Sequence, residues 1–150
     1  MGFNIVLFEP EIPNNTGNIG RLTLATNSVL HLVGPLGFEL TDSKLKRAGL
    51  DYWQHVSVEF YHDIEEFFSI HGDKNLAYLS SHASKSHYEI PFEENMFLVF
   101  GKESKGLPKD IIEKNHNNSF RIPMYSKKIR SLNLANAVSV VVYEGLRNLE

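Results

Sequence analysis

The chain has 150 residues, 42% of them apolar, with no cysteine and a net charge of −3. This length and apolar content fit one folded domain, residues 1–150, and exclude a mainly disordered chain. The missing cysteine excludes disulfides, thiolate metal sites and a cysteine nucleophile. Because we find no signal-peptide pattern and no apolar run long enough to span a bilayer, we expect a cytoplasmic protein with no membrane association.

The charge is unevenly distributed along the chain. Between residues 101 and 130, eight Lys and Arg oppose three Asp and Glu, whereas the remainder has seven against fifteen. One basic segment therefore lies on an acidic body. It is either a solvated face or a surface for a polyanion such as nucleic acid.

Strand and helix patterns alternate in the first half of the chain. Residues 3–8 are apolar and β-branched, which predicts a strand, and the side chains of residues 14–16 are candidate N-caps for the helix that follows. A second strand is predicted over residues 29–33, before Gly34-Pro35. A short charged helix is expected at 42–48.

The same alternation continues to the end of the chain. We expect strands at 56–58, 76–80, 96–100 and 120–123, and helices at 63–70 and 108–114. The last helix has apolar residues at helical spacing from Leu134 to Leu149, with Asn133 or Asn136 as its cap. This order predicts an α/β fold with a mostly parallel sheet flanked by helices.

Three segments hold more Gly, Asn and charge than packing requires. Residues 13–21 (PNNTGNIGR) follow a strand and open a helix, where free N–H groups and Arg21 favour an anion. Residues 100–108 (FGKESKGLP) end a buried strand in a sharply turned loop that carries Glu103. Residues 121–138 join a basic loop to a helix start rich in small residues. Each segment taken alone is equally compatible with an ordinary helix cap or a solvated loop.

Together these segments resemble one family. Residues 12–19 (IPNNTGNI), 100–108 (FGKESKGLP), and 122–124 (IPM) followed by 131–138 (SLNLANAV) are similar to the three ordered motifs of the SPOUT class of RNA 2′-O-methyltransferases. The resemblance covers essentially the whole chain. It is strongest to the minimal branch, which has no added RNA-binding domain and methylates the wobble pyrimidine (nucleotide 34) of tRNA.

The resemblance implies a fold and a cofactor that the residue pattern alone does not. It implies a C-terminal trefoil knot, although true knots are rare in proteins. It also implies that the knotted loops bind S-adenosylmethionine as methyl donor, with no metal. The positions matching the donor site are Leu79, Gly101, Ile122, Met124, Ser131, Leu132 and Ala137.

The chemistry that the resemblance implies needs an oriented ribose hydroxyl, positive potential and a proton acceptor, because the hydroxyl is a weak nucleophile. The residues expected to act are Arg21, Asn15, Glu103, Ser131 and Asn133. Arg21 is expected to clamp a phosphate, since a guanidinium does not readily lose a proton. Glu103 or solvent is the expected proton acceptor.

Binding of tRNA is expected across a homodimer, as in the family. The expected phosphate contacts are Arg21, Lys102, Lys105, Lys127, Lys128 and Arg130, with Lys44, Lys46 and Arg47 as an extension. The first and last helices are expected at the dimer interface, with Gly20 and Gly145 as close-contact points.

The histidines show no metal-ligand spacing. His55, His62, His71, His82 and His87 are expected at the surface or at helix caps. Three other functions stay open: methylation of another tRNA or rRNA position, a non-catalytic RNA-binding module, and a phosphate- or nucleotide-binding enzyme. Retention of the motif residues argues against the second, and the missing Walker lysine and acidic metal pair argue against the third.

Overall fold

The computed structural model describes residues 2–40, 43, 47 and 50–150. The strands are β1 (Asn4–Phe8), β2 (Val29–Val33), β3 (Val58–Tyr61), β4 (Leu76–Leu79), β5 (Lys85–Ser86), β6 (Phe97–Phe100) and β7 (Ser119–Arg121). The helices are α1 (Pro13–Ala25), α3 (Ile64–His71), α4 (Lys109–Lys114) and α5 (Leu134–Leu149). Short 3₁₀ turns are η1 (Leu50–His55), η2 (His87–Glu89) and η3 (His116–Asn118). Among the described helices, none has the length and apolar character needed to cross a membrane.

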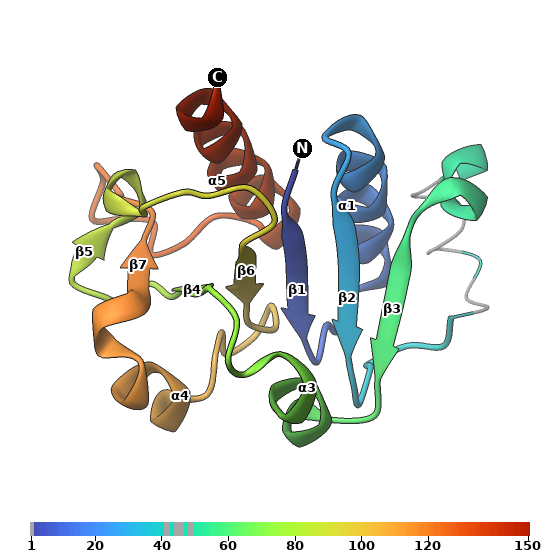
Figure 1. Ribbon diagram of the computed structural model, residues 1–150, viewed down its shortest axis with the longest axis horizontal. Helices are drawn as coiled ribbons and strands as arrows, with labels where there is room; N and C mark the ends of the chain where they lie inside the picture. The colour runs from blue at the N-terminus through green and yellow to red at the C-terminus, as the bar shows by residue number, and fades with distance from the viewer. Residues whose placement is uncertain (1, 41–42, 44–46, 48–49) are drawn as a thin grey trace.

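The strands form one sheet in the order β3-β2-β1-β6-β4-β7-β5 (Figure 1). Each neighbouring pair is parallel. The predicted α/β fold with a parallel sheet flanked by helices is therefore confirmed. The C-terminal knot stays a prediction.

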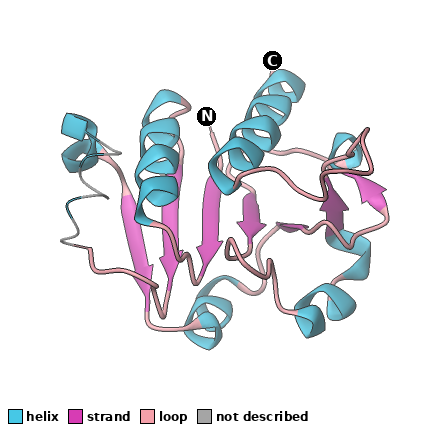
Figure 2. Cartoon of the chain, turned by 180° about the vertical axis from the view of Figure 1, so that it is seen from behind, coloured by secondary structure: helices cyan, strands magenta, loops and turns pink. Residues whose placement is uncertain are grey.

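Alternate residues of each central strand bury their side chains on opposite faces of the sheet. In β1, Ile5 and Leu7 pack with Ile19 of α1 and Val138 of α5. Val6 and its neighbours on the other face pack with Phe67 of α3. Figure 2 shows α1 and α5 together on one face of the sheet. Burial on both faces explains why the central strands are continuously apolar.

Helix α1 starts earlier than predicted. Its N-cap is Ile12, which makes no side-chain cap hydrogen bond, and Pro13 is the first helical residue. Proline suits that position because its φ is already helical and its missing N–H would have no partner there. The prediction of side-chain caps at 14–16 is therefore wrong. Asn15 and Thr16 are instead buried within the first turns.

Other boundaries also differ from the prediction. The strand expected at 56–58 begins only at Val58, because residues 50–55 form η1 just before it. The two-residue strand β5 is too short to give an alternating pattern and was not expected. The short helix expected at 42–48 falls on residues that, apart from 43 and 47, lie outside the described ones, as do Lys44 and Lys46.

Gly20 and Gly145 are close-contact points within the chain, which corrects their expected place between two chains. A Cβ on Gly20 would lie 2.8 Å from a ring carbon of Trp53, and one on Gly145 would lie 2.6 Å from a ring carbon of Phe3. Both glycines are buried. Their small size lets α1 and α5 pack against aromatic rings of their own chain.

Candidate active site

A cavity of about 400 Å³ opens where β4, β6 and β7 end. Parallel α/β sheets hold ligands outside the carboxyl ends of their strands, which is where this cavity lies. Residues from the start of α1 and from the segment before α5 complete its wall. The lining residues are Ile12, Asn15, Leu79, Ser80, Ser81, His82, Phe100, Gly101, Lys102, Glu103, Ser104, Lys105, Gly106, Ile122, Met124, Arg130, Ser131, Leu132, Asn133, Leu134 and Ala137.

The loop after β6 closes tightly on itself. A Cβ on Gly101 would lie 2.0 Å from the carbonyl carbon of Gly106, so no larger residue fits there. Gly106 has φ +70°, which glycine adopts without strain. Its N–H donates to the carbonyl of Lys102 at 2.8 Å. The sharp turn predicted from the two glycines is therefore confirmed.

Two carboxylates lock this loop to the segment after β1. Glu103 accepts hydrogen bonds from the backbone N–H groups of Glu11 at 2.8 Å and Ile12 at 3.0 Å. In return, the Glu11 carboxylate accepts from the N–H of Ser104 at 2.9 Å. This backbone donor holds the pKa of Glu11 below its usual value. No local pattern indicates a role for Glu11, because its partner Ser104 lies 93 positions away.

The start of α1 holds a negative group that belongs to the chain itself. Glu103 also accepts from Nδ2 of Asn15 at 3.2 Å, so its carboxylate lies against the first turn of the helix. The positive end of the helix dipole favours a negative charge there. The sequence predicts an external anion at this helix start, whereas in the structure the carboxylate of Glu103 occupies that position.

Asn133 connects the same network to α5. Its Nδ2 donates to Oδ1 of Asn15 at 3.1 Å, and its own Oδ1 accepts from the N–H groups of Ala135 and Asn136. Asn133 is therefore the N-cap of α5, which confirms the first of the two predicted caps. A continuous chain of hydrogen bonds, Glu103–Asn15–Asn133, joins the three motif segments at the wall of the cavity.

Comparison with known proteins identifies the family. The family model described as "SpoU rRNA Methylase family" matches residues 2–143. The chain belongs to this family. It is 49% identical over 148 residues to the tRNA (cytidine(34)-2′-O)-methyltransferase of Saccharophagus degradans, covering 98% of this chain and 96% of that protein.

Solved structures show the same fold. One, described as "Structural insights into the 2-OH methylation of C/U34 on tRNA", matches with a TM-score of 0.93 at 42% identity, covering 98% of this chain and 95% of that one. The SpoU methyltransferase AviRb from Streptomyces viridochromogenes, in complex with AdoMet, matches with a TM-score of 0.84 at 21% identity. This match covers 97% of the present chain and 57% of AviRb.

In this SpoU family member, most of the predicted site residues meet at the cavity. Its lining includes every predicted donor contact, namely Leu79, Gly101, Ile122, Met124, Ser131, Leu132 and Ala137. Of the residues predicted to act in catalysis, it includes Asn15, Glu103, Ser131 and Asn133. Of the predicted RNA contacts, it includes Lys102, Lys105 and Arg130. The structure thus gathers these residues, and their individual roles stay predictions.

Arg21 does not line the cavity. It lies six residues beyond Asn15, about 9 Å further along the helix axis. Its guanidinium carbon is 4.9 Å from the centroid of the exposed Tyr52 ring. Lys127 and Lys128 are exposed outside the lining, whereas Lys102 is only 3.8 Å from the carboxylate of Glu9.

Sequence reasoning missed the loop after β4. Ser80, Ser81 and His82 line the cavity, and their position directly after a buried strand was the available signal. His87 was expected at the surface or at a cap, and this is wrong because its side chain is 1% exposed. Burial lowers its pKa. Within the described residues, no group of three or more His, Cys, Asp or Glu is placed to hold a metal.

A second polar network lies on the face of the sheet that packs against α3. Nε2 of His31 is 2.8 Å from Oδ1 of Asn4, and its Nδ1 is 2.8 Å from the hydroxyl of Tyr61. That hydroxyl is 2.9 Å from Nε2 of His71. If His31 donates from Nε2, its Nδ1 accepts from Tyr61, and the Tyr61 oxygen accepts from His71. Nδ1 of His71 is then an acceptor, and it has no hydrogen-bond partner among the residues that the structure describes.

Proposed function

We propose that this SpoU family member transfers the methyl group of S-adenosylmethionine to the ribose 2′-hydroxyl of nucleotide 34 of tRNA, a wobble cytidine or uridine, and that residues 1–150 act as one domain. The observation that carries the proposal is that all three motif segments meet around one cavity. The similarity to the Saccharophagus degradans enzyme, which extends over nearly the full length of both chains, supports the choice of nucleotide.

The cavity suits a donor of this size. Its volume of about 400 Å³ lies within the range of small-molecule sites. Leu79, Ile122 and Leu132 offer apolar contacts, and the tight turn at Gly101 exposes backbone groups to a flat ligand. We propose that these residues, together with Met124, hold the adenosyl part. When bound, the donor supplies a sulfonium methyl group.

The chain would then orient the ribose and stabilise its developing charge. The ribose oxygen forms a bond to the methyl carbon, the carbon–sulfur bond breaks, and the hydroxyl proton leaves. Ser131 and Asn133 at the cavity wall would orient the hydroxyl, and Arg130 would supply positive potential. Glu103 is committed to two backbone N–H groups, which favours a positioning role for it and solvent as the proton acceptor.

We extend the proposal to a homodimer that binds tRNA across both copies. Arg21 is exposed and lies outside the cavity of its own chain. In a dimer, Arg21 of one copy would contact RNA held at the cavity of the other. Sedimentation of the wild type tests this, since a monomer at the concentration of full activity would contradict it.

Nucleoside analysis tests the proposed reaction. Unmodified tRNA is incubated with the protein and S-adenosylmethionine carrying a labelled methyl group, then digested to nucleosides and to fragments. We expect labelled 2′-O-methylcytidine or 2′-O-methyluridine that maps to nucleotide 34. Label at another tRNA position, or in ribosomal RNA alone, would assign the same chemistry to a different target. Absence of label from every RNA would overturn the proposed function.

A further inference from the structure

Tyr125 is the most exposed of the large hydrophobic side chains in the described part of the chain, at 88%. It follows Met124, which lines the cavity, and precedes Arg130, which lines it too. Isolated apolar residues are common on protein surfaces, so the exposure alone decides nothing. Its functional interest comes from its position in the chain, directly after a residue of the proposed donor site and before a basic segment.

A second exposed tyrosine lies on another element. Tyr88 belongs to η2, which has a capping box made by Ser86 and Glu89 at its N-terminal end, and it is 57% exposed. The phenol of Tyr125 is the main cause of the raised pKa of Tyr88. Of the two tyrosines, Tyr125 is the more exposed and therefore the better candidate for stacking.

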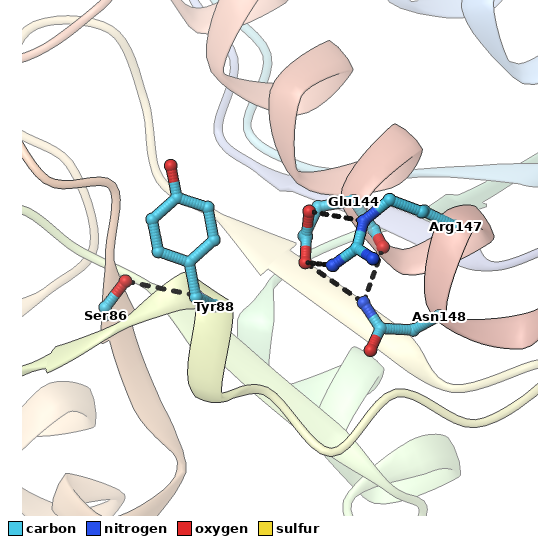
Figure 3. A network of polar contacts seen from close by, with 5 residues as sticks. All are labelled: Ser86, Tyr88, Glu144, Arg147 and Asn148. Atoms are coloured by element: carbon cyan, nitrogen blue, oxygen red, sulfur yellow. Dashed lines mark hydrogen bonds and ion pairs between the residues drawn. The ribbon is translucent and has the colours of Figure 1, made fainter.

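The segment that follows Tyr125 is basic. Lys127, Lys128 and Arg130 follow Tyr125 and are exposed. None of the three forms an ion pair with any residue that the structure describes. The nearest acidic side chain on α5, Glu144, is neutralised by Arg147 at 2.8 Å and accepts from Asn148 (Figure 3). This surface therefore combines unpaired positive charge with exposed aromatic rings.

We propose that Tyr125 stacks on a base adjoining the methylated nucleotide, while Lys127 and Lys128 contact the flanking phosphates. The inference rests on the proposed function, since it concerns the RNA that this function would bind. Proteins hold single-stranded loops by stacking unpaired bases on aromatic side chains and by contacting phosphates with cations. The methyl donor and the base platform would then lie on either side of Met124, so that stacking fixes the ribose next to the donor.

The charge argues against a second copy of the chain at this surface. A contact centred on a twofold axis at this segment would bring Lys127, Lys128 and Arg130 of one copy against the same three cations of the other. Like charges facing each other across an interface are unfavourable. A polyanion meets no such repulsion, which favours RNA as the partner.

A stacking probe tests the inference directly. An anticodon stem-loop carries the fluorescent base 2-aminopurine at nucleotide 33 or at nucleotide 35, and the whole protein is titrated into it. We expect one of the two positions to be quenched by the wild type and by Tyr125→Phe. In Tyr125→Leu, most of the quenching should be lost and the KM for tRNA should rise about tenfold, with the affinity for S-adenosylmethionine unchanged.

Phe60→Leu is the matched control. Phe60 is 51% exposed but lies on β3, at the far edge of the sheet from β7 and β5, and should behave as the wild type. Unchanged quenching and KM in Tyr125→Leu, or dissociation of a dimer by it, would overturn the stacking role even if the wild type methylates nucleotide 34. A wild type that neither methylates tRNA nor binds the stem-loop would overturn the proposed function, and the stacking role with it.

Discussion

The two polar networks of the molecule use similar side chains in different surroundings. His31, Tyr61 and Asn4 lie on one face of the sheet, where His31 is 3% exposed and its ring packs among Tyr61, Phe67 and Phe97. The Glu103–Asn15–Asn133 network lies at the ends of the strands, and each of its members lines the cavity. No member of the first network lines it.

This difference separates a structural role from a functional one. In the His31 network the side chains bond mostly to one another, which fixes β2 and β3 against α3. In the Glu103 network they bond to backbone N–H groups of the loops and of α5. Those loops form the wall of the cavity. Damage to the first network should therefore lower stability, and damage to the second should lower binding and rate.

Gly101→Ala is the strongest test of the functional role of the loops that form the cavity wall. The added methyl group would lie 2.0 Å from the backbone of Gly106, so the loop after β6 has to open. We expect the affinity for S-adenosylmethionine to fall roughly 100-fold, because the preformed shape of the site is lost. Calorimetric titration measures it. Lys109→Ala is the control, because Lys109 is exposed just after the same loop and does not line the cavity, and this variant should bind almost as the wild type does.

Lowering the pH tests the structural role of the His31 network. Burial lowers the pKa of His31 to about 4, so between pH 6.5 and pH 4 the unfolded chain gains a proton that the folded chain does not. The contribution of His31 to the free energy of unfolding is complete above pH 6.5. It falls as the pH drops, by up to about 3 kcal/mol at pH 4. Burial also lowers the pKa of His71 and His87, which act in the same direction.

Urea unfolding at pH 7 and pH 4.5 measures this loss. His31→Gln should reduce the pH dependence, whereas the control His82→Asn should keep it, since His82 is exposed. Equal pH dependence in the two variants would show that the His31 network does not link stability to pH.

Glu103→Gln separates positioning from proton transfer. A glutamine keeps one acceptor oxygen but turns an NH₂ group toward a backbone N–H, so one bond to Glu11 or Ile12 is lost. We expect the affinity for the donor to fall about tenfold, in line with a lost hydrogen bond to a charged group. A proton acceptor would instead lower kcat and leave donor affinity unchanged. Glu113→Gln, on the exposed side of α4, is the control.

Asn133 variants give the smallest expected effect on stability. Asn133→Ala removes the cap of α5 and should cost about 1 kcal/mol of unfolding free energy. Asn133→Asp keeps the capping oxygen but places a carboxylate against Oδ1 of Asn15, so its melting temperature should stay near that of the wild type while kcat/KM falls. If both variants lose activity only in proportion to stability, Asn133 is a cap and nothing more.

The sequence predicted those parts of the fold that local patterns determine. Apolar runs placed β1, β2 and β6, and helical spacing with an asparagine cap placed α5. Long-range contacts were not accessible in the same way. The hydrogen bonds of Glu103 to Glu11 and Asn15 span about 90 positions, and no local pattern records them.

The site was predicted better by resemblance than by pattern. The motifs named residues that meet at one cavity, and their role in binding the donor stays a prediction, whereas the position of Arg21 outside the cavity follows from the pitch of α1 and required the structure. The burial of His87 was missed because a single histidine after a two-residue strand has no periodic pattern to indicate which face it occupies.

The cavity is proposed to serve methyl transfer to one ribose hydroxyl, so removal of that hydroxyl is the sharpest test of the proposed function. Two tRNAs are made that are identical except that nucleotide 34 carries ribose in one and 2′-deoxyribose in the other. We expect transfer of one labelled methyl group to the first tRNA and none to the second. Equal labelling of both tRNAs would place the methyl group elsewhere and overturn the proposed target.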